Sequence, residues 1–160
     1  MPPICGKIII TKWKFPLVGR IKLNSDACSN PGQSGGDCVA RDFQGRLLWA
    51  IADGYGIVTN MVAEVRVLLQ GIQRCRSMGV IRVEIESDSL ILVQILQQKV
   101  FPPWTVLFEV RKIQDLLSQM NFEVSHVYRE SNCVADKLAN IGCKDGKYLL
   151  FENWDVCLEW

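Results

Sequence analysis

The sequence is poor in several features that mark particular classes of protein. It has a single histidine, and its 7 cysteines form no Cys-x-x-Cys pair, which argues against a structural zinc site of the usual spacing. No apolar run approaches the roughly 20 residues of a membrane span, and Ile8–Ile10 is too short for the core of a signal peptide. We therefore expect reduced thiols and a cytoplasmic or nuclear protein without a membrane partner.

An excess of one charge is also missing. The chain carries 18 Lys and Arg against 17 Asp and Glu, a net charge of +1, so composition shows no electrostatic signature of a nucleic-acid binder. Any binding of phosphate would need a local cluster of charge or bound cations. The length of 160 residues suits one compact domain, and the hydrophobic content of 49% excludes global disorder.

Hydrophobic periodicity predicts an alternation of strands and helices. We expect strands over 21–26, 36–42, 46–55, 80–87 and 122–128, and helices over 60–78, 90–96, 102–120 and 131–142. Short turns should make the first three strands antiparallel, whereas strands reached through helices should be parallel. This order predicts an α/β fold with one five-stranded mixed sheet flanked by helices. We divide the chain into a lead-in (1–18), a domain (19–143) and a C-terminal tail (144–160), the tail being either an edge strand or a docking segment.

Four acidic residues occupy places where proteins build sites. Asp26 and Asp88 stand at the ends of predicted strands, while Glu64 and Asp136 lie in the first turns of predicted helices. Sites in α/β proteins form at the carboxyl ends of strands, and carboxylate oxygens suit Mg²⁺ or Mn²⁺. Taken singly, however, a role as a helix cap or as a solvated side chain explains each of these acids at least as well as a role in a site.

The segments around these acids form four blocks in a fixed order. They are 22–26 with Asn30-Pro31-Gly32 and Gly35–Gly45; Thr59-Asn60-x-x-Ala63-Glu64; Val83–Ser89; and His126–Asn132 with Ala135-Asp136-x-Leu138-Ala139. Together, over about residues 20 to 143, they resemble type 1 ribonuclease H domains. The likeness is greatest to the plant reverse-transcriptase-like ribonuclease H domain, found alone or behind the polymerase of LINE-type retroelements.

The resemblance implies a ribonuclease H-like fold and a metal-dependent endonuclease that hydrolyses the RNA strand of RNA–DNA hybrids. It implies two Mg²⁺ ions, for which Mn²⁺ can substitute, held by catalytic carboxylates. An RNA–DNA hybrid is then the partner, with a reverse transcriptase domain of a longer polyprotein as a second candidate, and we expect a monomer. The implied metal-binding and catalytic residues are Asp26, Glu64, Asp88 and Asp136, with His126 assisting proton transfer; the implied contacts to nucleic acid are Ala27, Asn30, Asn60, Ser89 and Asn132.

Departures from the family pattern keep a second hypothesis open. Ala27 stands where glycine is usual, Met61 and Leu90 replace polar residues, and no basic extension follows Leu96. These features favour a catalytically weak nucleic-acid-binding or interaction module of the same fold. An exonuclease or an integrase fits the sequence context of the acids less well.

Individual residues also carry alternatives. His126 shares a strand face with Val124 and Tyr128, so a half-buried structural imidazole is as good an interpretation as proton transfer. We expect Trp49 and Trp104 to serve packing, and the cysteines to be small core residues rather than nucleophiles. Candidate helpers in phosphate binding are Lys22, Arg129 and Lys137.

Overall fold

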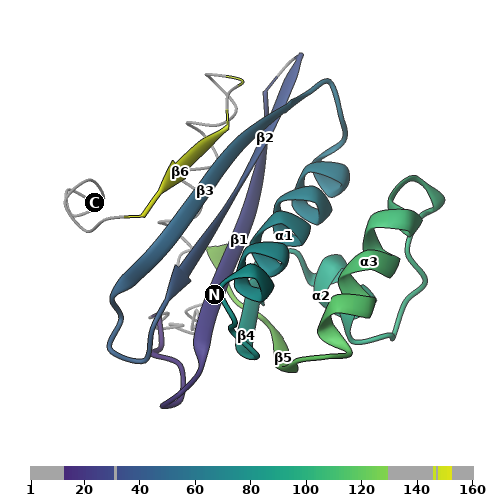
Figure 1. The fold of residues 1–160 in the computed structure, drawn as a ribbon. Helices are drawn as coiled ribbons and strands as arrows, with labels where there is room; N and C mark the ends of the chain where they lie inside the picture. The colour runs from purple at the N-terminus through teal and green to yellow at the C-terminus, as the bar shows by residue number, and fades with distance from the viewer. Residues whose placement is uncertain (1–12, 31, 130–145, 147, 153–160) are drawn as a thin grey trace, which may run out of the picture.

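The computed structural model describes residues 13–30, 32–129, 146 and 148–152, which form one mixed sheet with helices packed on one side (Figure 1). The strands are β1 (Ile21–Asn30), β2 (Gln33–Arg41), β3 (Leu47–Gly56), β4 (Arg82–Ser87), β5 (Asn121–His126) and β6 (Leu149–Phe151). The helices are α1 (Asn60–Ser77), α2 (Leu90–Leu96) and α3 (Leu107–Leu117), with a 3-10 turn η1 (Trp104–Val106) before α3.

The pairing of the strands follows the predicted mixture. β1 pairs with β2, and β2 with β3, in antiparallel hairpins, whereas β4 is parallel to both β1 and β5. The predicted count of five strands was wrong by one, because β6 pairs antiparallel with β3 and extends the sheet to the order β5-β4-β1-β2-β3-β6. Leu149 and Phe151 of this short strand pack against Val39, Ala50 and Ala52. The edge strand was one of the two expectations for the tail.

Helix α1 begins and ends where its sequence predicts. The Thr59 hydroxyl accepts a hydrogen bond from the Val62 amide at 3.2 Å, which satisfies one of the free N–H groups of the first turn. Beyond the last turn, Gly79 has φ +76, a conformation that ends helices and favours glycine. Glu64 lies among the buried residues of the helix, on the side that faces the sheet.

The main core lies between the sheet and its helices. Cys38 and Cys75 are buried in it, as expected of small core residues, and burial raises the pKa of both thiols, which disfavours the nucleophilic thiolate. For Cys28 the expectation was wrong, because this residue is half-buried and lies outside the core. Trp49 is 1% exposed and fills the same core, but the expectation for Trp104 was wrong, because its side chain is 86% exposed at the start of η1. Further contributors from both layers are Leu23, Ile51, Val65, Leu68, Ile72, Ile85, Leu92, Ile95, Val110 and Ile113.

Two segments bear on the predicted organisation of the chain. Residues 13–20, assigned largely to the lead-in, contact the sheet: Trp13 hydrogen-bonds to Asn24, and the Leu17 amide to Glu84. The predicted helix over 131–142 lies outside the described residues, and Asn132, Asp136 and Lys137 lie outside with it. Among the helices that are described, none has the length and apolar character needed to cross a membrane.

Candidate functional site

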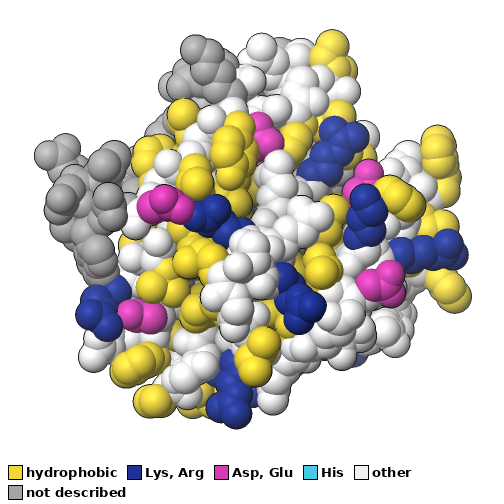
Figure 2. All heavy atoms as spheres, in the orientation of Figure 1, with side chains coloured by type: hydrophobic (Ala, Val, Ile, Leu, Met, Phe, Trp, Pro, Cys, Tyr) yellow, Lys and Arg dark blue, Asp and Glu magenta, His cyan; other side chains and the backbone are white. Residues whose placement is uncertain are grey.

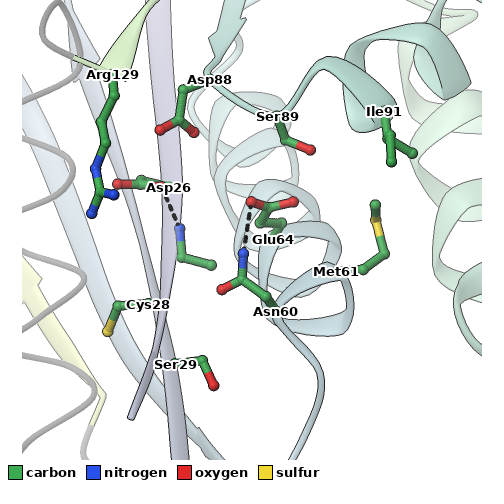
Figure 3. A pocket seen from close by; sticks show the side chains of 11 residues that line it. Asp26, Cys28, Ser29, Asn60, Met61, Glu64, Asp88, Ser89, Ile91 and Arg129 are labelled. Carbon is green, nitrogen blue, oxygen red and sulfur yellow. Dashed lines mark hydrogen bonds between the residues drawn. The ribbon is translucent and has the colours of Figure 1, made fainter.

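Three of the four predicted carboxylates meet at one place. Asp26 comes from β1, Glu64 from the second turn of α1, and Asp88 from the junction between β4 and α2 (Figure 3). Each offers a carboxylate oxygen, and these atoms all lie within 4.8 Å of one another. Asp26 and Glu64 are 4% and 6% exposed, and Asp88 is half-buried. The fourth predicted carboxylate, Asp136, lies outside the described residues.

The register of the sheet explains this convergence. β1 and β4 run parallel with Ser25 opposite Ser87, so the next residue along each strand places its side chain at the same edge. Helix α1 packs across β1 and β2, and its inward face carries Glu64. The Asn60 amide, one turn earlier, donates a hydrogen bond to Glu64 Oε1 at 3.1 Å and fixes that carboxylate.

A short local hydrogen bond holds the Asp26 carboxylate, and the cap of α2 fixes the backbone that follows Asp88. Asp26 Oδ1 accepts from the Ala27 amide at 2.8 Å. After Asp88, the Ser89 hydroxyl accepts from the Leu92 amide at 3.3 Å and starts α2. The beginning of α2 is thereby fixed directly behind the carboxylate.

The electrostatics of the cluster favour a bound cation. The pKa of Glu64 is raised from 4.5 to about 7; burial is the largest cause, a hydrogen bond from Ser89 partly offsets it, and the negative charge of Asp88 adds to it. A carboxyl group with this pKa is partly protonated at neutral pH. A divalent cation among the three oxygens would relieve their repulsion and displace that proton. Carboxylate oxygens are the donors that Mg²⁺ and Mn²⁺ prefer.

The cluster lies on the wall of an open cleft of about 680 Å³. Ala27, Asn60 and Ser89, which were predicted to contact nucleic acid, also line it. Asn30 ends β1, and its side chain is not described. Arg129, a candidate helper in phosphate binding, and Met61, an apolar departure from the family pattern, line the cleft as well. The lining residues that were not singled out from the sequence are Cys28, Ser29 and Ile91.

His126 lies beside the cluster, and its ring is exposed. Its Nε2 atom is 3.1 Å from the backbone oxygen of Asp88, and the ring stands edge-on to Tyr128 with centroids 6.0 Å apart. The expectation of a half-buried structural imidazole was wrong, because β5 is the strand next to β4 at the end of the described sheet and its side chains remain largely open. The imidazole is therefore exposed and adjoins the backbone of Asp88, although it is not among the residues that line the cleft.

The basic side chains that were proposed to help bind phosphate differ in their access to the cleft. Lys22 was wrongly expected to reach phosphate: it is 2% exposed, and its ammonium group lies 2.6 Å from a carboxylate oxygen of Glu86. Arg129 lines the cleft, and Figure 3 shows its guanidinium on the same side as the Asp26 carboxylate. Figure 2 shows Lys and Arg side chains interspersed with acidic and apolar ones over the face in view, in keeping with the balanced composition.

Comparison with solved structures identifies the class of fold. The N-terminal ribonuclease H domain of a Mycobacterium tuberculosis protein superposes with a TM-score of 0.75 at 24% identity, covering 79% of this chain and 95% of that chain. LC11-RNase H1, isolated from compost by a metagenomic approach, gives a TM-score of 0.71 at 29% identity, covering 79% of this chain and 97% of that one. A structure of LC11-RNase H1 with an RNA/DNA hybrid gives 0.72 at 24% identity, covering 78% and 96%. The chain therefore has the ribonuclease H fold.

Sequence comparison identifies the family within that class. The Reverse transcriptase-like family matches residues 24–142, and the chain belongs to this family. An Arabidopsis thaliana protein provisionally named a ribonuclease H protein is 33% identical over 131 residues, which cover 80% of this chain. The match spans only 21% of that longer plant protein.

Proposed function

We propose that the chain is a metal-dependent endonuclease that hydrolyses the RNA strand of RNA–DNA hybrids with two divalent cations, Mg²⁺ or Mn²⁺. One observation carries the proposal: three carboxylates from separate elements place oxygens within 4.8 Å of one another on the wall of an open cleft. A second support is that LC11-RNase H1, which shares the fold, has been solved with an RNA/DNA hybrid.

The donor set fits divalent cations. In the proposal Asp26, Glu64 and Asp88 hold them, and Asp136 completes the set. Bound there, the cations would supply Lewis-acid stabilisation of the phosphate and activation of water. A network of acids at this spacing serves no evident purpose in the fold, because like charges repel and buried carboxylates destabilise the folded state unless they are neutralised.

The chain's own residues would bind and orient the substrate. Asn60 and Ser89 present polar groups along the cleft, and the proposal assigns them, with Ala27, Asn30 and Asn132, to contacts with the hybrid. Contacts to ribose 2′-hydroxyls are how proteins distinguish RNA from DNA. His126, exposed and hydrogen-bonded near Asp88, would carry a proton to or from the reacting groups.

The alternative is a nucleic-acid-binding module of the same fold with weak catalysis. It is favoured by the apolar side chains of Met61 and Ile91 at the cleft and by the methyl group of Ala27 directly after Asp26. We also propose that the domain works within a longer protein, because the match spans only 21% of the plant relative. A reverse transcriptase is the proposed companion domain, as in the foamy viral protease-reverse transcriptase, which contains the same fold.

The substrate class is tested by comparing matched nucleic acids. RNA–DNA hybrid, double-stranded RNA, double-stranded DNA and single-stranded RNA of one sequence are incubated with the protein and Mg²⁺ or Mn²⁺. The proposal expects internal cuts only in the RNA strand of the hybrid. Binding of the hybrid without cleavage at any concentration of either metal would contradict the enzyme and support the binding module.

A further inference from the structure

A buried polar network lies directly below the carboxylate site. Leu23, Val83 and Ile85 face the helices in the main core, so the alternate residues of β1 and β4 face the other side of the sheet. On that side Lys22, Asn24 and Glu86 are 2%, 1% and 8% exposed. Three polar side chains, two of them charged, are therefore withdrawn from water at adjacent positions.

Each oxygen of the Glu86 carboxylate is bound by a side chain of β1. Lys22 Nζ lies 2.6 Å from Glu86 Oε1, and Asn24 Nδ2 donates to Glu86 Oε2 at 3.0 Å. Asn24 and Glu86 are direct partners in the parallel register of β1 and β4. The network thus joins the two strands two residues before Asp26 and Asp88.

The segment before β1, residues 13–20, contacts this network on the side away from the helices. Trp13 Nε1 donates to Asn24 Oδ1 at 3.0 Å, and the indole ring lies 5.4 Å from Lys22 Nζ. Lys22 also donates to the backbone oxygen of Lys14 at 2.6 Å, and the Leu17 amide donates to Glu84 Oε2 at 2.9 Å. The segment therefore contacts β1 and β4 together.

This arrangement does more than fill space. A buried ion pair is tolerated only with good geometry and full hydrogen bonding, and it then specifies one arrangement of the groups it joins. Parallel strands are paired slightly less stably than antiparallel ones. A side-chain link across β1 and β4 therefore helps to keep these two strands in their register. A shift of either strand would separate the carboxylates that follow.

We propose that Trp13, Asn24 and Glu86, with Lys22, are positioning residues for the carboxylate site. They hold β1 and β4 so that the oxygens of Asp26 and Asp88 stay at the spacing that binds a cation. The segment before β1 is by this argument part of the functional unit. The inference rests on the proposed function, because it takes these carboxylates as metal ligands.

The test uses uncharged substitutions in the full chain, so that the field at the site changes little. Trp13→Phe keeps an aromatic ring and removes the N–H group that bonds to Asn24. Asn24→Leu removes the link to Glu86. The matched control is Tyr55→Phe, which deletes a comparable hydrogen bond, of 2.8 Å to Gln70 Oε1, between β3 and α1. Binding of Mg²⁺ and Mn²⁺ is measured by calorimetry, and each variant's melting temperature by circular dichroism.

We expect the Kd for Mg²⁺ to rise about tenfold in Trp13→Phe and Asn24→Leu, as is common when residues behind metal ligands are changed. Tyr55→Phe should lower the melting temperature and leave the Kd unchanged. If Trp13→Phe is destabilised but binds metal with the Kd of the wild type, the positioning role is overturned. If Asn24→Leu does not fold, Trp13→Phe by itself tests the positioning role. A wild-type chain that binds neither metal contradicts the proposed function itself, and the positioning role falls with it.

Discussion

Asp26 and Asp88 each follow a serine, and these two serines, Ser25 and Ser87, lie opposite each other in the parallel pair β1 and β4. The pairing brings two carboxylates from distant parts of the chain to one edge of the sheet. Glu64 faces them from α1 within 4.8 Å. Their mutual repulsion and partial burial determine how the protein should respond to pH, to metal and to substitution.

The first prediction concerns pH in the absence of metal. Burial raises the pKa of Glu64 from 4.5 to about 7, so the folded state holds this proton more tightly than the unfolded state. Between pH 4.5 and about pH 7, the two pKa values, the free energy of unfolding should therefore fall as pH rises. The contribution of Glu64 to this fall is on the order of 3 kcal/mol. Glu64→Gln should remove that component. Urea unfolding with EDTA across the window measures it, and an identical pH dependence in Glu64→Gln would contradict the assignment.

The second prediction concerns stabilisation by metal. A ligand at about 100 times its Kd stabilises the folded state by about 2.7 kcal/mol, which for a chain of this size raises the melting temperature by roughly 5–10 °C. We expect this shift with Mg²⁺ or Mn²⁺ in the wild type and its loss in Asp26→Asn. The control is Asp115→Asn, because Asp115 is an exposed carboxylate on α3. An equal shift in Asp26→Asn would show that the metal binds elsewhere.

The third prediction concerns His126. If its exposed ring moves a proton, His126→Ala should lower kcat for hybrid cleavage by on the order of 10²-fold. The Kd for Mg²⁺ and the melting temperature should change little, because the ring is not packed in the core. Single-turnover cleavage beside a metal titration separates these effects. Loss of metal binding in this variant would assign the imidazole a structural role instead.

The fourth prediction concerns Ala27, whose side chain lies at the cleft wall beside Asp26. Ala27→Gly should lower the Kd for hybrid, because the backbone then approaches the substrate more closely. Glycine in a strand should also lower the free energy of unfolding by roughly 0.5–1 kcal/mol. Binding is measured in an Asp88→Asn background to prevent cleavage. An unchanged or higher Kd would show that the methyl group is not in the way.

Much of the fold was predictable because its signals are local. Strand-like patterns and turn signals predicted the first five strands, and the apolar stripe of residues 60–78 with Gly79 after it predicted α1. The sixth strand was left open, because β6 has three residues and is defined by its pairing with β3. Local sequence contains no information about such a distant partner.

The site was predictable in its carboxylates and less so in its surroundings. The resemblance of the sequence blocks to ribonuclease H domains singled out Asp26, Glu64 and Asp88, which the sheet register and the packing of α1 bring together. Alternation along β1 gave Lys22 the same face as Asp26, but it could not show that Glu86 on β4 would bind it. The same alternation is the signal that would have found Cys28, two residues beyond Asp26.

The most direct test is cleavage of an RNA–DNA hybrid labelled on the RNA strand, with Mg²⁺ or Mn²⁺ titrated from zero, by the wild type, Asp88→Asn and Asp115→Asn. The proposed function predicts metal-dependent cuts by the wild type and Asp115→Asn, and loss of cleavage in a folded Asp88→Asn. Cleavage by Asp88→Asn at the wild-type rate, or none by a folded wild type with either metal, would contradict it.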